Sequence, residues 1–146
     1  MSLNEVHIEA HSEQARRETI IARQILGLIN GERIIHTSSH LNIARDDMNH
    51  LVQAIDAHQG LRGLLKRVSR ANGGERIDFI NGGTIIYVAR TGHTGRGFSA
   101  DLLIVDDADK RCTEEFMSSA LPMLYTSRNP QVMFIKTLRP VNDETV

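Results

Sequence analysis

Two adjacent carboxylates at the end of an apolar run are the residues best suited to chemistry in this sequence. Residues 102–105 form a short continuous apolar run, and Asp106 and Asp107 follow it directly. Continuous apolar character is typical of a parallel strand that helices cover on both faces. In open α/β sheets ligands bind outside the carboxyl ends of the strands. Two acids at this place could hold a metal ion and a nucleophilic water.

The segment before this run is a glycine-rich loop that carries arginines. Residues 90–97 contain Arg90, Arg96 and three glycines. Glycine lets the backbone approach a ligand closely, and the guanidinium group binds phosphate oxygens through a planar fork of donors. The loop and the two acids together predict phosphate chemistry.

Composition predicts one soluble globular domain over residues 1–146. The chain has 146 residues, of which 40% are hydrophobic, enough for one sizeable core. Its 17 Lys and Arg nearly balance its 18 Asp and Glu, so any nucleic-acid contact must use a local patch. Cys112 is the single cysteine, which excludes an intrachain disulfide and fits a reducing compartment. The sequence contains neither a membrane-length apolar run nor a signal-peptide pattern, so we expect a cytoplasmic protein without membrane contact.

Strand and helix patterns alternate along the chain, which predicts an α/β fold of three layers around a mainly parallel sheet. We expect a short strand over residues 6–10, a helix over 14–29, a strand over 33–37 and a final strand over 131–135. A second helix should begin near residue 39, because an apolar stripe at helical spacing follows it.

Two further elements complete the expected order. Residues 75–89 contain two β-rich runs joined by Asn-Gly-Gly, which predicts an inserted hairpin. Thr113 can cap a helix through Leu121, and Pro122 prevents its continuation.

Four segments, in order along the chain, resemble the ATPase domain of tailed-phage terminase large subunits, the motors that pump DNA into capsids. They are GERIIHTSSHLNIARDDM, ANGGERIDFINGGTIIYVAR, GRGFSADLLIVDDA and SRNPQVMFIKT. The resemblance runs from about Arg17 to Thr137. It implies a P-loop NTPase-like fold, with ATP and Mg²⁺ as cofactors. It also implies DNA, the portal and the small terminase as partners, and a homo-oligomer.

The resemblance also implies roles for single residues. Asp106 and Asp107 correspond to the Walker B acids, the first holding Mg²⁺ and the second, usually glutamate, polarising the attacking water. Arg96 corresponds to the arginine that reaches a neighbouring subunit's nucleotide. Thr137 corresponds to the residue that couples hydrolysis to movement.

The phosphate-binding Walker A segment corresponds to residues 10–17, AHSEQARR, and departs from the pattern GxxxxGK[ST]. Ala15 stands where glycine wraps the phosphate, Arg16 where lysine neutralises it, and Arg17 where a hydroxyl binds Mg²⁺. We therefore expect a degenerate domain, such as a prophage remnant truncated at both ends, with weak or no ATP hydrolysis and without bound cofactor. We also expect no nuclease domain of the kind that terminases carry after the ATPase domain.

Two alternatives stay open at this stage. One is an active DNA-packaging ATPase that oligomerisation or a partner completes. The other is a non-enzymatic module for self-association or protein binding, in which the sheet serves as a scaffold and its edges pair with another chain.

Two other groups of residues receive an ordinary interpretation. His36 and His40 are separated by a strand-to-helix junction and show no third ligand, so hydrogen-bonding histidines are favoured over a metal pair. A local basic run could contact DNA phosphates, although a solvated helix face is the default interpretation. Its members are Arg62, Lys66, Arg67, Arg70 and Arg76.

Overall fold

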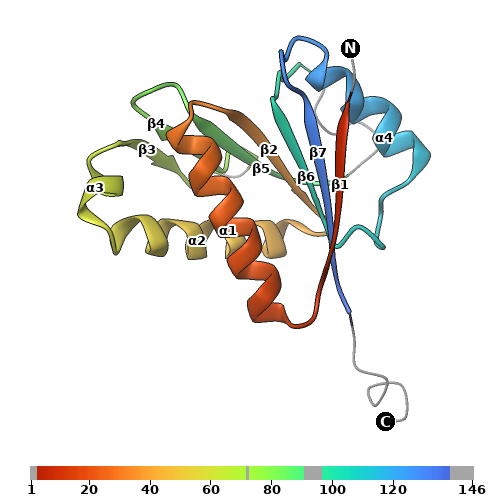
Figure 1. The fold of residues 1–146 in the computed structure, drawn as a ribbon, viewed down its shortest axis with the longest axis horizontal. Helices are drawn as coiled ribbons and strands as arrows, with labels where there is room; N and C mark the ends of the chain where they lie inside the picture. Colours follow the sequence, from red (N-terminus) through yellow and green to blue (C-terminus); the bar gives the residue numbers. More distant parts are fainter. Residues whose placement is uncertain (1–2, 72, 91–96, 139–146) are drawn as a thin grey trace.

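A seven-stranded sheet runs through the part of the chain that this computed structural model describes, residues 3–71, 73–90 and 97–138 (Figure 1). The strands are β1 (Asn4–Ala10), β2 (Arg33–Ser38), β3 (Leu65–Ser69), β4 (Arg76–Phe79), β5 (Thr84–Ala89), β6 (Leu102–Asp106) and β7 (Gln131–Thr137). Their order in the sheet is β1-β7-β6-β2-β5-β4-β3. The neighbouring strands β1, β7, β6, β2 and β5 are parallel, whereas β4 is antiparallel to both β5 and β3. The expected mainly parallel sheet is confirmed.

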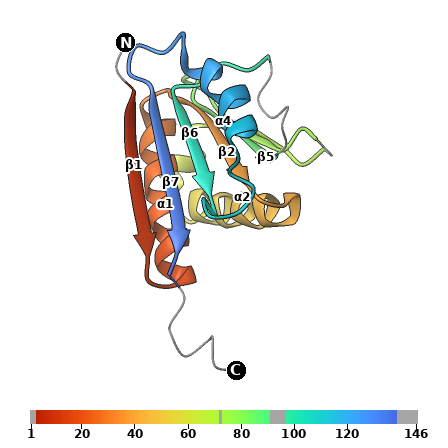
Figure 2. The same ribbon diagram turned by 90° about the vertical axis from the view of Figure 1, so that its right-hand side faces the viewer.

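Helices cover both faces of this sheet (Figure 2). The helical elements are α1 (Glu13–Ile29), α2 (Leu41–Asp56), α3 (Gln59–Arg62), α4 (Glu114–Ala120) and the short 3₁₀ helix η1 (Leu121–Leu124). The helices α1 and α2 pack on one face, and α4 with η1 packs on the other. The expected three-layer α/β architecture is therefore confirmed.

The strand β6 shows why its apolar run is continuous. Leu102 and Ile104 belong to the core beneath α1 and α2, whereas Leu103 and Val105 belong to the core beneath α4. Successive side chains of a strand point to opposite faces. Because both faces are covered, alternation between apolar and polar residues is lost, as the sequence indicated.

The inward face of α1 carries polar residues within an apolar stripe. Arg16, Ile20, Gln24 and Leu28 follow one another at four-residue spacing and are all buried. Ser12 caps the helix by accepting a hydrogen bond from the backbone N–H of Ala15 at 3.0 Å. The fold thus directs one guanidinium and one amide toward the sheet.

The predicted hairpin over residues 75–89 is present as β4 and β5, joined by residues 80–83. Its second strand pairs in parallel with β2 and so belongs to the central sheet. The solvated helix face expected for the basic run holds for Arg62, which lies exposed on α3, but is wrong for Lys66 and Arg67, which lie on β3, an antiparallel partner of β4. Five residues of mixed polarity carry too little periodicity to predict this strand, and pairing with β4 stabilises it.

The strand β1 lies at the other edge of the described sheet. It pairs only with β7 there, and most of its residues are exposed. Within the described residues, no helix is both long and apolar enough to cross a membrane.

Candidate functional site

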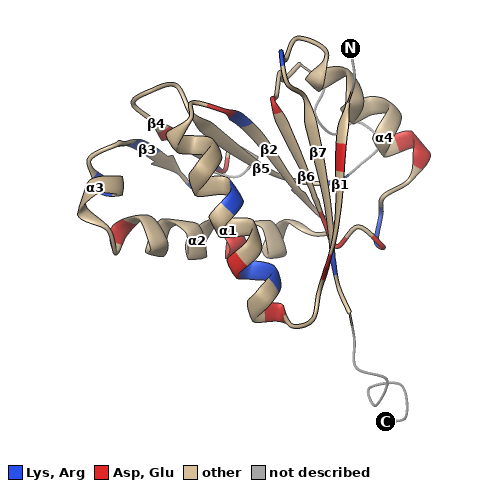
Figure 3. Ribbon diagram, viewed as in Figure 1, with Lys and Arg blue, Asp and Glu red and all other residues tan. Residues whose placement is uncertain are grey.

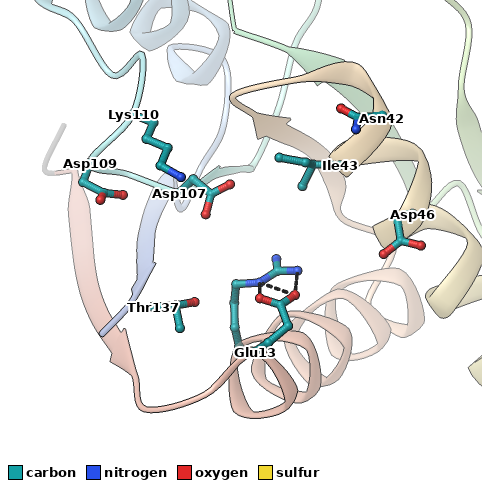
Figure 4. Close-up of a pocket in the computed structure, with 9 residues that line it drawn as sticks. Glu13, Asn42, Ile43, Asp46, Asp107, Asp109, Lys110 and Thr137 are labelled. Atoms are coloured by element: carbon teal, nitrogen blue, oxygen red, sulfur yellow. Dashed lines mark hydrogen bonds and ion pairs between the residues drawn. The ribbon is translucent and has the colours of Figure 1, made fainter. Parts of the chain in front are cut away.

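The carboxyl ends of four parallel strands meet at one edge of the sheet. The strands β1, β7, β6 and β2 end there, beside the first turns of α1 and α2. A pocket of about 600 Å³ opens at this edge (Figure 4). It is lined by Glu13, Arg16, Asn42, Ile43, Asp46, Asp107, Asp109, Lys110 and Thr137. The place is the one at which α/β sheets usually bind ligands.

Arg16 extends from the pocket into the interior of the protein. Only 3% of the residue is exposed. Its Nη1 donates to Asp106 Oδ2 at 2.6 Å, and its Nη2 donates to Asp47 Oδ1 at 3.0 Å. The same Nη2 also donates to Glu13 Oε1 at 2.5 Å. One guanidinium therefore joins α1, α2 and the end of β6.

The carboxylate of Asp106 is fully buried, and both of its oxygens have partners. Oδ1 accepts a hydrogen bond from the backbone N–H of Asp107 at 2.9 Å, and Oδ2 accepts the bond from Arg16. The positive group that pairs with this carboxylate is therefore the guanidinium of Arg16, from α1 of the same domain.

His36 lies against the same carboxylates from the middle of β2. It is fully buried, and its Nδ1 is 3.0 Å from Gln24 Nε2. Its Nε2 is 3.3 Å from Asp47 Oδ2 and 3.8 Å from Asp106 Oδ2. Burial alone would lower the pKa of His36, but these two carboxylates outweigh that effect and raise the pKa to about 9. The imidazole therefore carries a positive charge at neutral pH.

Arg16, His36, Asp47 and Asp106 form a group that we call the buried ion cluster. Burial would raise the pKa of Asp47, yet His36 and Arg16 hold that pKa well below its usual range. Two cations thus face two anions in the protein interior. Removing one member of such a group leaves an uncompensated buried charge and typically costs about 3–5 kcal/mol.

Asp107 faces the pocket beside the chain of Lys110 (Figure 4). Its backbone has a positive φ of 50°, a left-handed conformation that aspartate tolerates better than most residues. Burial and the nearby charge of Asp106 raise the pKa of Asp107. Arg90 fixes the turn around it, because this buried guanidinium donates to the backbone carbonyls of Asp107 and Lys110.

Comparison with known proteins addresses the fold. No protein-family model matches the chain, and no curated protein sequence matches it. Among solved structures, the large terminase of bacteriophage HK97 superposes with a TM-score of 0.78 at 13% identity over 92% of this chain and 29% of that one. The large terminase ATPase domain of Thermus phage P74-26 gives a TM-score of 0.68 at 12% identity over 94% of this chain and 61% of that one.

The chain has the fold of a phage terminase ATPase domain. It spans less than two thirds of the length of these terminase chains. The C-terminal domain of a possible DNA helicase from Lactobacillus plantarum is also similar, with a TM-score of 0.52 at 13% identity over 93% of this chain and 74% of that one. The expected P-loop NTPase-like fold class is thereby confirmed.

The structure places most of the residues that the terminase resemblance singled out around the pocket. Asp106 lies beneath it, and Asp107 and Thr137 line it. Thr137 ends β7 opposite Ala10 of β1, and its hydroxyl is buried without a hydrogen-bond partner in the part of the chain that the structure describes. The prediction for Arg96 falls outside the described residues.

Residues 10–17, where the resemblance implies a Walker A segment, form no phosphate cradle. Only residues 11–12 separate β1 from α1, so Ala15, Arg16 and Arg17 lie on the helix itself. Acidic and basic residues mix along the first turns of α1 (Figure 3). The side chain of Arg17 is partly exposed and lies 3.8 Å from Glu13.

The residues present do not fit a magnesium nucleotide. A P-loop needs a glycine-rich loop whose backbone N–H groups surround the phosphates, and here Ser12 takes the N–H of Ala15. The pocket lining contains four carboxylates and two cations, and one of these cations, Arg16, is bound to buried acids. Such a lining repels a polyphosphate.

The basic residues lie away from this pocket, on α3, β3 and the segments that follow. Arg62, Lys66, Arg67 and Arg70 are exposed. Arg67 and Arg76 both pair with Asp78, each at 2.8 Å, so two of the five basic residues share one carboxylate and only one of their two charges is balanced locally. Arg70 lies 3.4 Å from the amide oxygen of Asn49.

Two residues of the site were missed by sequence reasoning. Asp47 falls on the buried face of α2 among Ala44, Met48 and Leu51, and Gln24 falls on the buried face of α1. The signal available in the sequence was a charged or polar residue at a position where the apolar stripe of a helix is buried. Because buried charges are almost always paired, such a residue indicates a partner close by. His36 hydrogen-bonds with Gln24, as expected of an ordinary buried histidine, but its contacts with Asp47 and Asp106 were not anticipated.

Proposed function

We propose that this chain is a homologue of the ATPase domain of phage or prophage terminase large subunits, of DNA-packaging ancestry, that hydrolyses ATP weakly or not at all. The observation that supports the loss of activity is the ion pair between Arg16 and Asp106. By resemblance Asp106 holds Mg²⁺, and here a guanidinium nitrogen lies 2.6 Å from its Oδ2.

The energetic consequence follows from burial. A metal ion that enters at Asp106 must first displace Arg16 from two buried carboxylates. Breaking a buried pair costs about 3–5 kcal/mol, which corresponds to roughly a hundredfold to a few thousandfold in affinity. An affinity for magnesium nucleotide in the micromolar range would fall to the millimolar range or beyond.

Isothermal titration of the full chain with Mg²⁺ and ATP tests the proposal, together with a phosphate-release assay. We expect millimolar affinity or weaker and no turnover. Micromolar binding with measurable turnover would contradict it. The Asp107→Glu variant is a matched control, because it supplies the longer acid usual in terminases while leaving Arg16 on Asp106. It should stay inactive if the ion pair is the cause.

The same assay distinguishes the active packaging ATPase. If oligomerisation or a partner completes the site, DNA should stimulate hydrolysis, and Arg96→Ala and Asp106→Asn should each abolish it. Hydrolysis that depends on DNA and on both residues would replace our proposal.

DNA contact is the second part of this proposal, through Arg62, Lys66, Arg67 and Arg70. Their exposure on one region of the fold supports it, and Arg67 should contribute least because it is paired with Asp78. Fluorescence anisotropy with duplex DNA should show binding that weakens steeply with salt. Lys66→Glu should weaken it more than a reversal on another surface, Glu5→Lys, which should not weaken it at all. Equal effects would contradict a local patch.

The exposed edge of β1 favours the interaction module as a further candidate. Its outer backbone groups face no partner strand within the described sheet, and Val6 beside them is 37% exposed. Such edges pair readily with other strands. Analytical ultracentrifugation without nucleotide should then reveal a dimer, whereas a strictly monomeric species would contradict this candidate.

A further inference from the structure

Two buried polar atoms beside the buried ion cluster have no hydrogen-bond partner within the described residues. They are Nε2 of His36 and Oε1 of Gln24, and both residues are fully buried. Nε2 faces the carboxylates of Asp47 and Asp106 at ion-pair distances, without the geometry of a hydrogen bond. Unsatisfied buried atoms are rare in native proteins, and each one calls for an explanation.

The spacing of these groups matches the needs of a metal ion. One nitrogen of His36 and one oxygen each of Asp47 and Asp106 all lie within 4.8 Å of one another. Metal–ligand bonds of about 2.0–2.2 Å separate neighbouring ligand atoms by roughly 3–4 Å. The Nε2 of His36 already lies 3.3 Å and 3.8 Å from the two Oδ2 atoms.

Arg16 occupies the position of the cation in this arrangement. Its Nη1 lies 2.6 Å from Asp106 Oδ2 and 3.3 Å from Asp47 Oδ2. These are the same two oxygens that Nε2 of His36 faces. The guanidinium nitrogen therefore lies between the oxygens that would bind a metal.

We propose that His36, Asp47 and Asp106 form a binding site for a divalent transition-metal ion, and that Arg16 is its gate. The guanidinium fills the site in the state described and leaves it when a metal enters. One imidazole nitrogen with two carboxylates suits Zn²⁺ or Mn²⁺, whereas Mg²⁺ prefers oxygen ligands alone. The inference does not depend on nucleotide binding, since neither His36 nor Asp47 lines the pocket.

Gln24 supplies the outer support that such a site requires. A histidine that binds metal usually donates its other ring N–H to a neighbour, which fixes the ring. Gln24 Nε2 lies 3.0 Å from His36 Nδ1. Turning the amide by half a rotation places Oε1 there instead, where it accepts from Nδ1–H. The incoming metal displaces the proton of the imidazolium from Nε2 into solvent and binds the lone pair that it leaves, so both unpartnered atoms acquire a partner.

The pocket gives the guanidinium a place to go. The Nη2 of Arg16 already donates to Glu13, whose side chain is 59% exposed. Asp46 and Asp107 line the same pocket. Arg16 can therefore move outward while it keeps one carboxylate and approaches two others. The acidic lining also attracts the incoming cation.

Metal titration of the full chain without nucleotide tests the inference. Wild type and Arg16→Met, which has similar length and no charge, are titrated with Zn²⁺ and Mn²⁺ by calorimetry, with thermal unfolding as a second readout. Arg16→Met should bind one ion per chain roughly a hundredfold more tightly than wild type. Its melting temperature should rise with metal far more than that of wild type. Adding His36→Gln should abolish both effects.

Three results would overturn the inference. They are equal affinity in Arg16→Met and wild type, binding that survives His36→Gln, and Mg²⁺ binding as tight as that of Zn²⁺ or Mn²⁺. If Arg16→Met does not fold without metal, Arg16→Lys takes its place, because lysine keeps the positive charge but reaches less far toward the carboxylates. The three results named above then apply to Arg16→Lys. ATP is absent throughout, so the outcome is independent of whether the chain binds magnesium nucleotide.

Discussion

The free energy of unfolding is expected to fall as the pH rises above neutrality, because His36 loses its proton. Burial would lower the pKa of His36, but Asp106 and Asp47 raise it from 6.5 to about 9. A group whose pKa is higher in the folded chain stabilises the fold fully below its unfolded pKa. It loses that stabilisation as the pH rises through its folded pKa. The loss should therefore occur between pH 6.5 and about pH 9.

The expected size of this loss follows from the two pKa values. The difference between 6.5 and about 9, at about 1.36 kcal/mol per pH unit, corresponds to about 3 kcal/mol. Domains of this kind have unfolding free energies of about 5–15 kcal/mol. The expected loss is thus a large share of the total free energy of unfolding. Because one proton is involved, this free energy cannot fall by more than about 1.4 kcal/mol per pH unit.

Urea unfolding across this pH range measures the effect. Wild type should lose stability steadily, whereas His36→Gln should be less stable at low pH and nearly independent of pH. His50→Gln is a matched control at a partly exposed position of α2, and it should keep the slope of wild type. A flat profile in wild type, or an equal slope in His36→Gln, would refute the role of the buried imidazolium.

Three further predictions concern single substitutions, each measured by urea unfolding. Arg16→Met should cost about 3–5 kcal/mol because it unpairs buried acids, whereas Arg33→Met, which removes a partly exposed pair with Asp101, should cost at most about 1 kcal/mol. Equal costs would contradict the cluster. Gly83→Ala should cost about 1–3 kcal/mol, because its Cβ would lie 2.6 Å from the backbone oxygen of Leu28. A neutral result would show that this backbone yields. Ser12→Ala should cost about 1 kcal/mol through the lost helix cap, and no loss would mean that water replaces the hydroxyl.

Much of the fold could be predicted because its signals are local. The continuous apolar run of β6 indicated a strand covered on both faces, and the Asn-Gly-Gly turn indicated the β4–β5 hairpin. Thr113 was correctly expected to cap α4. Strand β3 was not predictable, because its stability depends on pairing with β4 rather than on its own pattern.

The site was predicted only in part. The terminase resemblance led to Asp106 and Asp107, and both lie at the edge where parallel strands end. It also placed Arg16 at the lysine position, but the guanidinium points to buried acids instead of a pocket phosphate. Side-chain direction depends on the length of the loop before α1 and on charges that approach from α2, and neither is a local property.

The sequence by itself determined the α/β class, the order of the elements other than α3 and β3, and the residue types at the carboxyl edge of the sheet. Periodicity, capping and turn residues act within a few positions, so a single chain shows them directly. Only the tertiary structure decided which charges meet. Arg16, His36, Asp47 and Asp106 come from four separate elements, and packing removes the water between them. Their surroundings are then of low polarity, which makes the pairing of these charges strong. The same packing places the guanidinium of Arg16 where the resemblance implied a metal ion.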